Sequence, residues 1–337
     1  MQIDFLIIVS FIILNLIFIN FFENIKFFHK NIDKPDAIRK LHKKPVPLAG
    51  GIIIFINLFF YFLIIFLNKK LLLNEILFTN RFDFVLFFLG CLLIFILGYL
   101  DDRLNISATV KFILIAFLVI LLLFLDENLI LNRIKFSFFD RIFYLSEFSL
   151  IFTCFCFLVF LNAFNMFDGI NLQSCSYSII IFVCVFIFYL DVILVKILLI
   201  SLITYGYLNF KNKSFLGDSG SLLLAFIISY IFIKLYNLNV INFSDEIVIF
   251  MIIPGIDLIR LFFIRILKKR NPLSSDRFHL HHLLLLKFSY KVTLTVIILL
   301  VLTPIGLNFF KTDNLYTIIF TVIIYSFLMV SIKQKKL

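Results

Sequence analysis

The chain has 337 residues, of which 63% are hydrophobic and 15% are charged, and its mean hydropathy is +1.12. Soluble domains average about 45–50% apolar and about 25% charged residues, so this composition excludes a soluble protein and predicts an integral membrane protein. The net charge of +11 does not indicate nucleic-acid binding, because basic loops on the inner side of a membrane and contact with anionic membrane lipid account for it.

Apolar runs predict the membrane spans, since a helix needs about 20 residues, with about 17 to 25 tolerated, to cross the hydrocarbon core. Eleven runs qualify, with ten as the alternative, and the weakest boundary separates the sixth from the seventh, where Asp191 alone marks the turn. The runs cover residues 3–22, 48–67, 84–100, 108–125, 148–164, 174–190, 192–208, 220–237, 246–267, 292–310 and 314–332. The predicted fold is therefore all-α, with a single polytopic membrane domain over residues 1–337.

Three smaller features complete this picture. The first run lacks a basic segment before it and a small-residue cleavage site, which predicts a retained span rather than a signal peptide. Segment 126–147 is too polar to span and alternates like a hairpin or an interfacial piece. The five cysteines lie in or beside apolar runs without metal-ligand spacing, which predicts small buried hydrophobic side chains.

Lysine and arginine residues predict the orientation of the spans. If the loop after the first run is cytoplasmic, 22 of the 31 basic residues lie on the inner side and 9 on the outer side. The positive-inside rule then places the N-terminus outside and the C-terminus in the cytoplasm. The same assignment puts the unusual polar motifs of the chain on the cytoplasmic side.

Asp101 and Asp102 end the third apolar run, in the stretch GYLDDRL. Carboxylates at the C-terminal end of a helix oppose its macrodipole, and adjacent negative charges repel one another unless a cation lies between them. A hard divalent ion such as Mg²⁺, held by one or two carboxylates and by substrate phosphates, fits this chemistry. A helix end that meets water is the alternative interpretation.

The stretch FLGDSGS, residues 215–221, has two glycines around Asp218 and Ser219 directly before an apolar run. Small residues let backbone amides approach a phosphate at a helix N-terminus, and Asp218 could bind a metal ion that bridges to that phosphate. An ordinary turn with Asp218 as the N-cap residue is the alternative.

The stretch NAFNMFDGIN, residues 162–171, brings three amide side chains and one carboxylate together at a predicted membrane surface. Amide and carboxylate oxygens bind hard cations and also hydrogen-bond sugar hydroxyls. Capping and turn formation around Gly169 is the alternative for any one of these residues.

The stretch DRFHLHH, residues 276–282, contains three of the five histidines. A zinc site is one interpretation, but no cysteine lies nearby and the carboxylates of the chain favour a harder ion. The basic sequence RILKKR just upstream indicates anion binding, with Arg277 making a planar bidentate contact to phosphate. A basic loop attracted to anionic lipid is the alternative.

The first inner loop reads DKPDAIRKLHKKPVPLAGG, residues 33–51. Its prolines and glycines predict a fixed turn, and Arg39 and His42 are among the residues that add positive charge. The predicted topology explains that charge but does not explain the Pro-x-Pro-x-x-Gly-Gly pattern.

As an ordered set, these motifs resemble the polyprenyl-phosphate N-acetylhexosamine-1-phosphate transferases of the MraY–WecA superfamily. The resemblance rests on GYLDDRLNISATVKF, NAFNMFDGIN, FLGDSGS and DRFHLHH, and it extends from about Asp33 to His282. The HLHH form and the stretch RKLHKKPVPLAGG are similar to the WecA branch, whereas the MraY branch usually has consecutive histidines. Eleven spans with the N-terminus outside agree with what the WecA branch implies.

The resemblance implies a reaction in which HexNAc-1-phosphate moves from a UDP-N-acetylhexosamine to undecaprenyl phosphate and UMP is released. GlcNAc is the expected sugar, with GalNAc, FucNAc and QuiNAc as alternatives, and Mg²⁺ is the expected cofactor, with Mn²⁺ as a substitute. The enzyme would be a multi-pass protein of the bacterial inner membrane with a cytoplasmic active site. It would catalyse the first step of a lipid-linked cell-surface polysaccharide such as O-antigen or teichoic acid. Membrane lipid is a further expected partner, nucleic acid is not, and a homodimer is left open.

The resemblance also assigns residues to roles. It implies that Asp101, Asp102 and Asp168 are catalytic and that Asp218 and Asn165 bind Mg²⁺. The expected substrate-binding residues are Lys111, Asn162, Asn171, Gly217, Arg277, His279, His281, His282, Arg39 and His42.

Two positions depart from the family pattern, because Asn171 stands where a second acidic residue is common and Leu172 where glycine is usual. Asn171 cannot act as a base. A phosphate monoester has a second pKa near 6, so the acceptor is mostly a dianion at pH 7 and the acidic pair is expected to position the metal and the nucleophile. A polytopic transporter with a cytoplasmic-side anion or metal site is the rival function, but transport sites lie near the bilayer midplane, between repeats that this sequence does not show.

Overall fold

The computed structural model describes residues 2–35, 44–68, 71–72, 75–272 and 278–333. The chain forms two compact units, each of which is described by itself. Unit 1 comprises Met1–Asp126 and Ser178–Ile228, and unit 2 comprises Glu127–Tyr177 and Ser229–Leu337.

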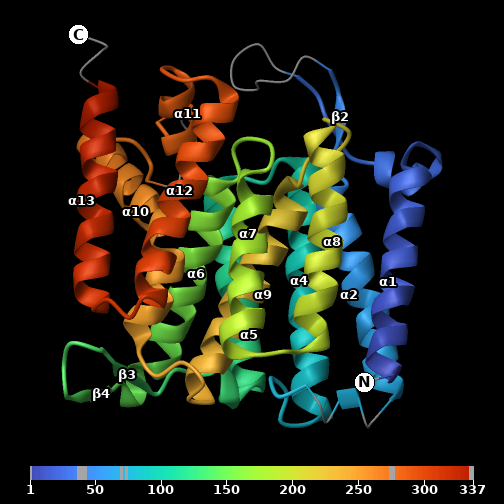
Figure 1. The fold of residues 1–337 in the computed structure, drawn as a ribbon, viewed down its shortest axis with the longest axis horizontal. Helices are drawn as coiled ribbons and strands as arrows, with labels where there is room; N and C mark the ends of the chain where they lie inside the picture. The colour runs from blue at the N-terminus through green and yellow to red at the C-terminus, as the bar shows by residue number, and fades with distance from the viewer. Residues whose placement is uncertain (1, 36–43, 69–70, 73–74, 273–277, 334–337) are drawn as a thin grey trace. The chain divides into compact units, whose positions relative to one another are not determined.

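Unit 1 is built from apolar helices, and α8 packs against α1 and α2 while α4 packs against α2 and α5. The helices are α1 (Gln2–Asn20), α2 (Gly50–Leu67), α4 (Arg81–Leu104), α5 (Ala108–Leu125), the second part of α7 (Gln173–Cys184), α8 (Ile193–Phe210) and the first part of α9 (Gly217–Asn237), which Figure 1 labels. Between α1 and α2 come two short 3₁₀ turns (Phe22–Asn24 and Lys26–His29) and an antiparallel pair of strands, β1 (Ile32–Asp33) and β2 (Val46–Pro47).

Glycines let three helices of unit 1 approach one another closely, as small residues commonly do in membrane helices. A Cβ atom on Gly51 of α2 would lie 2.4 Å from the backbone nitrogen of Gly220, and one on Gly98 of α4 would lie 2.5 Å from the carbonyl oxygen of Asp218. The start of α9 is therefore held backbone to backbone by α2 and α4.

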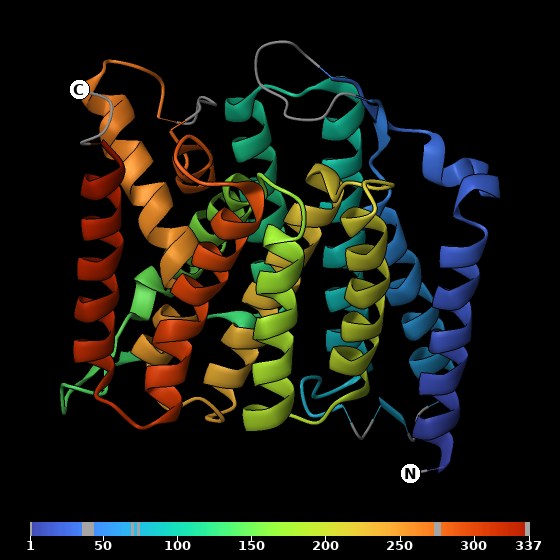
Figure 2. The same ribbon diagram turned by 45° about the horizontal axis from the view of Figure 1, so that its top comes forward.

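Unit 2 contains the remaining helices, and within it α10 packs against α6, α12 and α13. Its elements are 3₁₀ turns at Glu127–Leu129 and Ser146–Phe148, strands β3 (Arg133–Lys135) and β4 (Ile142–Tyr144), and helices α6 (Ser149–Phe167), the first part of α7, the second part of α9, α10 (Ser244–Leu267), α11 (Leu280–Leu285), α12 (Tyr290–Phe309) and α13 (Asn314–Lys333). Figures 1 and 2 agree that α10, α12 and α13 lie side by side, with the β3–β4 hairpin at the opposite end of this unit from α11.

Ten helices of the described residues are long and apolar enough to cross a membrane, which confirms the predicted all-α polytopic class. Ten of the eleven predicted runs coincide with these helices, and the remaining one is the sixth run, 174–190. That run forms α7 and a π-helical turn, Val185–Tyr189, which together make a shorter apolar helix. Leu190, at the predicted end of this run, adopts an extended conformation (φ −148°, ψ 123°) and ends the helix. The predicted turn at Asp191 is confirmed, and its carboxylate lies 2.5 Å from Nζ of Lys196.

Other predictions are also confirmed. Segment 126–147 contains the hairpin, in which Arg133 pairs with Tyr144. All five cysteines are free, and all but the half-buried Cys156 are buried. Helix α4 continues to Leu104 and α9 begins at Gly217, which puts Asp101, Asp102 and Asp218 inside terminal helical turns rather than in loops.

Candidate active site

Three helix ends of unit 1 bring together Asp101, Asp102, Lys111 and Asp218, which we call the carboxylate cluster. Nζ of Lys111, from the first turn of α5, lies 2.7 Å from Oδ2 of Asp101 and 2.9 Å from Oδ2 of Asp218. The Asp101 side chain is 4% exposed, whereas the Asp218 side chain is 34% exposed. Asp218 is therefore more accessible from outside the protein than Asp101.

Asp101 also fixes the turn between α4 and α5. Its Oδ1 accepts a hydrogen bond from the backbone of Ile106 at 2.7 Å, and Asn105 ends α4 in the left-handed conformation (φ 52°). Ser107 then caps α5 by accepting from the backbone of Val110, as serine commonly does at a helix N-terminus. These contacts place Lys111 over the carboxylate that it pairs with.

Asp102 caps the N-terminus of α9 from outside that helix. Its Oδ1 accepts from the backbone nitrogen of Asp218 at 2.7 Å and its Oδ2 from that of Ser219 at 3.1 Å. Amides of a first helical turn lack intrahelical partners and favour a negative charge. Gly217 has φ +73°, and a Cβ there would lie 2.6 Å from Oδ2 of Asp102. Asp102 therefore orients the segment that carries Asp218.

The Pro-x-Pro-x-x-Gly-Gly pattern of the first loop has a structural explanation. The backbone of Phe215 donates to the carbonyl of Pro47 at 2.9 Å, Gly50 donates to Phe215 at 3.0 Å, and Gly51 donates to Leu216 at 3.1 Å. The segment before α2 therefore braces the segment before α9. Arg39 and His42, predicted to bind substrate from the same loop, lie outside the described residues.

In unit 2 the turn after α6 lies against the start of α11 and α12. A Cβ on Gly169 would come within 1.9 Å of Nε2 of His281, and the Tyr290 hydroxyl donates to the carbonyl of Asn171 at 2.7 Å. The predicted residues Asp168 and Asn171 thereby lie close to the histidines in the fold. Asn162 and Asn165 lie one helical turn apart near the end of α6, and the Asn162 amide donates to the carbonyl of Leu158.

The three histidines form a compact group, with ring centroids 4.3 to 6.1 Å apart. His281 is 2% exposed, and its burial, together with the neighbouring His282 and His279, holds its pKa well below the ordinary value. His281 is therefore a neutral imidazole at pH 7 and can act toward an anion only as a hydrogen-bond donor. Arg277, the predicted phosphate ligand beside this group, lies outside the described residues.

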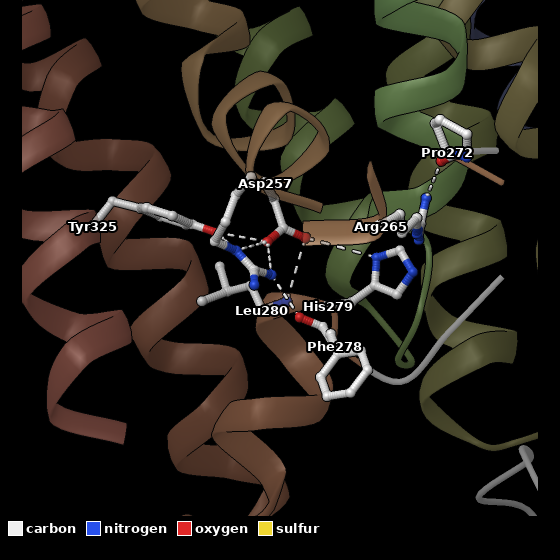
Figure 3. Close-up of polar contacts among 8 residues, drawn as sticks. Asp257, Arg265, Pro272, Phe278, His279, Leu280 and Tyr325 are labelled. Carbon is white, nitrogen blue, oxygen red and sulfur yellow. Dashed lines mark hydrogen bonds and ion pairs between the residues drawn. The ribbon is translucent and has the colours of Figure 1, made fainter. Parts of the chain in front are cut away.

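A buried polar network that the motifs did not predict holds the histidines (Figure 3). Asp257 of α10 accepts from the Tyr325 hydroxyl at 2.5 Å and from Nη2 of Arg260 at 2.6 Å. The neighbouring Arg265, 2% exposed, donates from Nη1 to the carbonyl of Pro272 at 2.8 Å. Ionisable residues inside an apolar span are functional candidates by default, so Asp257 and Arg260 could have been identified as candidates from the sequence. Tyr325 could not, because a tyrosine in an apolar helix is not unusual.

Comparison with known proteins identifies the family. The sequence profile of glycosyl transferase family 4 matches residues 84–236. An undecaprenyl-phosphate alpha-N-acetylglucosaminyl 1-phosphate transferase of Yersinia pestis is 30% identical over 272 residues, which cover 75% of this chain and 69% of that protein. The chain belongs to glycosyl transferase family 4.

Two further proteins are similar over comparable lengths. A probable undecaprenyl-phosphate N-acetylglucosaminyl 1-phosphate transferase of Bacillus subtilis (strain 168) is 30% identical over 280 residues, 80% of this chain and 74% of that protein. The Escherichia coli (strain K12) undecaprenyl-phosphate alpha-N-acetylglucosaminyl 1-phosphate transferase is 28% identical over 268 residues, 75% of this chain and 69% of that protein. These matches confirm the WecA-like resemblance and the transferase class of this multi-pass membrane protein.

The carboxylate cluster contains side chains of the kind that could hold a hard cation. Among the described residues, no group of three or more His, Cys, Asp or Glu side chains is arranged to hold a metal ion. Two carboxylate oxygens nevertheless converge on the Lys111 ammonium, and Mg²⁺ is usually held by one or two carboxylates completed by substrate phosphates and water. Asp218, the more exposed of the two carboxylates, therefore fits an ion that substrate helps to bind, while Asp101 pairs with Lys111.

Proposed function

We propose that the protein transfers HexNAc-1-phosphate, with GlcNAc as the expected sugar, from a UDP-sugar to undecaprenyl phosphate and releases UMP. Its similarity to undecaprenyl-phosphate N-acetylglucosaminyl 1-phosphate transferases supports this reaction. The observation that carries the proposal is the cationic Lys111 held between Asp101 and Asp218, where three helices of unit 1 end together. A transporter would not need this arrangement at the helix ends.

The charges of the reactants explain why such a cluster is needed. An oxygen of the acceptor phosphate attacks the β-phosphorus of the donor, the bond from that phosphorus to the bridging oxygen breaks, and UMP leaves with the electron pair. Both reactants are anionic and must approach to about 3–3.5 Å. Lys111 offsets part of this repulsion, and Arg277 is expected to contribute a second positive charge.

Asp218 would hold Mg²⁺, with Asn165 proposed as a further ligand and Mn²⁺ as a substitute. Such an ion supplies charge neutralisation and polarises phosphoryl oxygens when it is bound. Asp101 and Asp102 act by position, since the first pairs with Lys111 and the second accepts from two backbone amides. Neither needs to accept a proton, because the acceptor phosphate is mostly a dianion at pH 7.

The reaction is proposed to take place at the cytoplasmic face of the bacterial inner membrane. A sugar nucleotide from the cytosol and a phosphate on a membrane-embedded tail can meet only at an interface. The excess of Lys and Arg on the side that carries the polar motifs supports this sidedness. The product would begin a lipid-linked surface polysaccharide, with Asp168, the histidines and the asparagines of α6 contacting the donor.

A direct assay tests the proposal. Purified protein with UDP-GlcNAc, undecaprenyl phosphate and Mg²⁺ is expected to release UMP, to stop when EDTA is added, and to resume with excess Mg²⁺ or Mn²⁺. A panel with UDP-GalNAc, UDP-FucNAc and UDP-QuiNAc identifies the preferred sugar. Absence of UMP with every donor, from protein that remains folded, would refute the proposed function.

A further inference from the structure

The segment that carries the histidines, residues 278–282, runs into the first turn of α11 and is fastened at two backbone positions by two side chains of α10. Arg260 Nη2 donates to the carbonyl of Phe278 at 2.5 Å. Oδ2 of Asp257 accepts from the backbone nitrogen of Leu280 at 3.3 Å and lies 3.7 Å from Nδ1 of His279. We call residues 278–282 the histidine loop, and its backbone is thus held from a single helix.

Tyr325 of α13 completes this arrangement from a second helix. Its hydroxyl donates to Oδ1 of Asp257 at 2.5 Å and accepts from Nε of Arg260 at 2.9 Å. Tyr325 is 2% exposed, and Figure 3 shows its ring extending from α13 toward the Asp257 carboxylate. The hydroxyl therefore sets the positions of both side chains that hold the loop.

The two carboxylate oxygens of Asp257 have different partners, so the Tyr325 hydroxyl determines how the carboxylate is oriented. Oδ1 is occupied by Tyr325 and Arg260, which leaves Oδ2 directed at His279 and Leu280. Removing the hydroxyl would leave Asp257 and Arg260 each without one buried partner, and groups in that state reorient or cost stability. The carboxylate would then be free to rotate away from the loop.

We propose that Tyr325 is a positioning residue that fixes the histidine loop for binding of the nucleotide-sugar donor. This inference rests on the proposed function, in which the loop contacts the donor phosphates. It assigns a role in the reaction to the C-terminal helix, which lies outside the 84–236 segment matched by the family profile. Tyr325 acts through Asp257 and Arg260.

The first measurement is hydrogen exchange in the substrate-free protein, which does not depend on the reaction. In Tyr325→Phe, which keeps the ring and loses only the hydroxyl, peptides covering the histidine loop are expected to exchange about tenfold faster, equivalent to about 1.4 kcal/mol. Tyr316→Phe is the matched control, because Tyr316 lies on the same helix and is 71% exposed. An unchanged exchange rate of the loop in Tyr325→Phe would overturn the inference.

The second measurement links the loop to the donor. In Tyr325→Phe the KM for the UDP-sugar is expected to rise about tenfold, while the KM for undecaprenyl phosphate stays at its wild-type value. Faster exchange with an unchanged donor KM would contradict the positioning role. An equal rise in the KM values for both substrates would also contradict it. A wild-type protein that releases no UMP would refute the proposed function, whereas the exchange rate alone decides whether Tyr325 fixes the loop.

Discussion

The carboxylate cluster of unit 1 and the histidine loop of unit 2 are stabilised in different ways. In the cluster the motifs support one another, since Asp102 caps the segment that carries Asp218 and the glycines of three helices permit backbone contact. The histidine loop depends on Asp257, Arg260 and Tyr325, which belong to none of the motifs. A site of the first kind can be anticipated from its motifs, whereas the support of the second kind appears only in the folded chain.

The largest expected effect is on the buried support of the histidine loop. Asp257→Asn should lower the free energy of unfolding by about 3–5 kcal/mol, because removing one partner of a buried ion pair leaves the Arg260 charge uncompensated. Thermal unfolding in detergent measures the change, with Asp140→Asn on the exposed β3–β4 hairpin as the control. A melting temperature equal to that of the control would show that the loop does not depend on this pair.

The carboxylate cluster should respond in activity rather than in stability. Asp218→Asn is expected to lower the rate of UMP release at least about a hundredfold, a typical cost of removing one group that stabilises transition-state charge, with little change in melting temperature. Asp191→Asn, an exposed acid that pairs with Lys196, should keep wild-type activity. Comparable rates for the two variants would exclude Asp218 from the reaction.

The close approach of α4 to α9 gives a third test. A methyl group on Gly98 would lie 2.5 Å from the Asp218 carbonyl, and overpacking of this kind costs about 1–3 kcal/mol. Gly98→Ala should therefore lower both the melting temperature and the activity. In Gly306→Ala the new Cβ meets no described atom within 4 Å, so this variant should be neutral or slightly stabilised. Equal behaviour of the two alanine variants would contradict the backbone contact at Gly98.

Glu75, in the segment between α2 and α4, is a buried carboxyl group that belongs to neither the carboxylate cluster nor the histidine loop. It is 1% exposed, and burial raises its pKa from 4.5 to about 7. The folded protein therefore retains a proton that the unfolded chain releases, and this contribution to stability is present below about pH 4.5 and lost as the pH rises through 7.

The corresponding variant should show the smallest effect. Glu75→Gln cannot ionise, so at pH 8 it should be more stable than the wild type by about 1–2 kcal/mol, with the difference vanishing near pH 4.5 and the transferase activity unaffected. Melting temperatures at pH 5 and pH 8 measure this, with Glu147→Gln in an exposed turn as the control. A Glu75→Gln variant that is less stable than the wild type at pH 8 would reverse the predicted sign.

Much of the fold could be predicted because membrane helices are long apolar runs. The ten spanning helices, the hairpin and the break at Asp191 all followed from hydropathy and turn residues. The sixth run also forms an apolar helix, which ends at Tyr189, but its last turn is π-helical, which hydropathy does not reveal because it measures only apolar length. The pairing of the segment before α2 with the segment before α9 could not be predicted, because it joins residues far apart in the chain.

The candidate site was predicted to a similar extent. Asp101, Lys111 and Asp218 meet as the motifs suggested, but the sequence did not reveal that the two adjacent acids have different partners. That distinction depends on Asp101 facing α5 while Asp102 faces the first amides of α9. Tyr325 looks like any other tyrosine of an apolar helix until the fold brings it to Asp257.

The fate of the donor's β-phosphate tests the central claim most directly. Purified protein is incubated with UDP-GlcNAc labelled at the β-phosphorus, with undecaprenyl phosphate and Mg²⁺, and the products are separated into lipid and aqueous phases. Transfer of the phosphosugar predicts label in the lipid as a diphosphate and unlabelled UMP in the water. Label recovered as UDP, with the sugar alone on the lipid, would contradict the account.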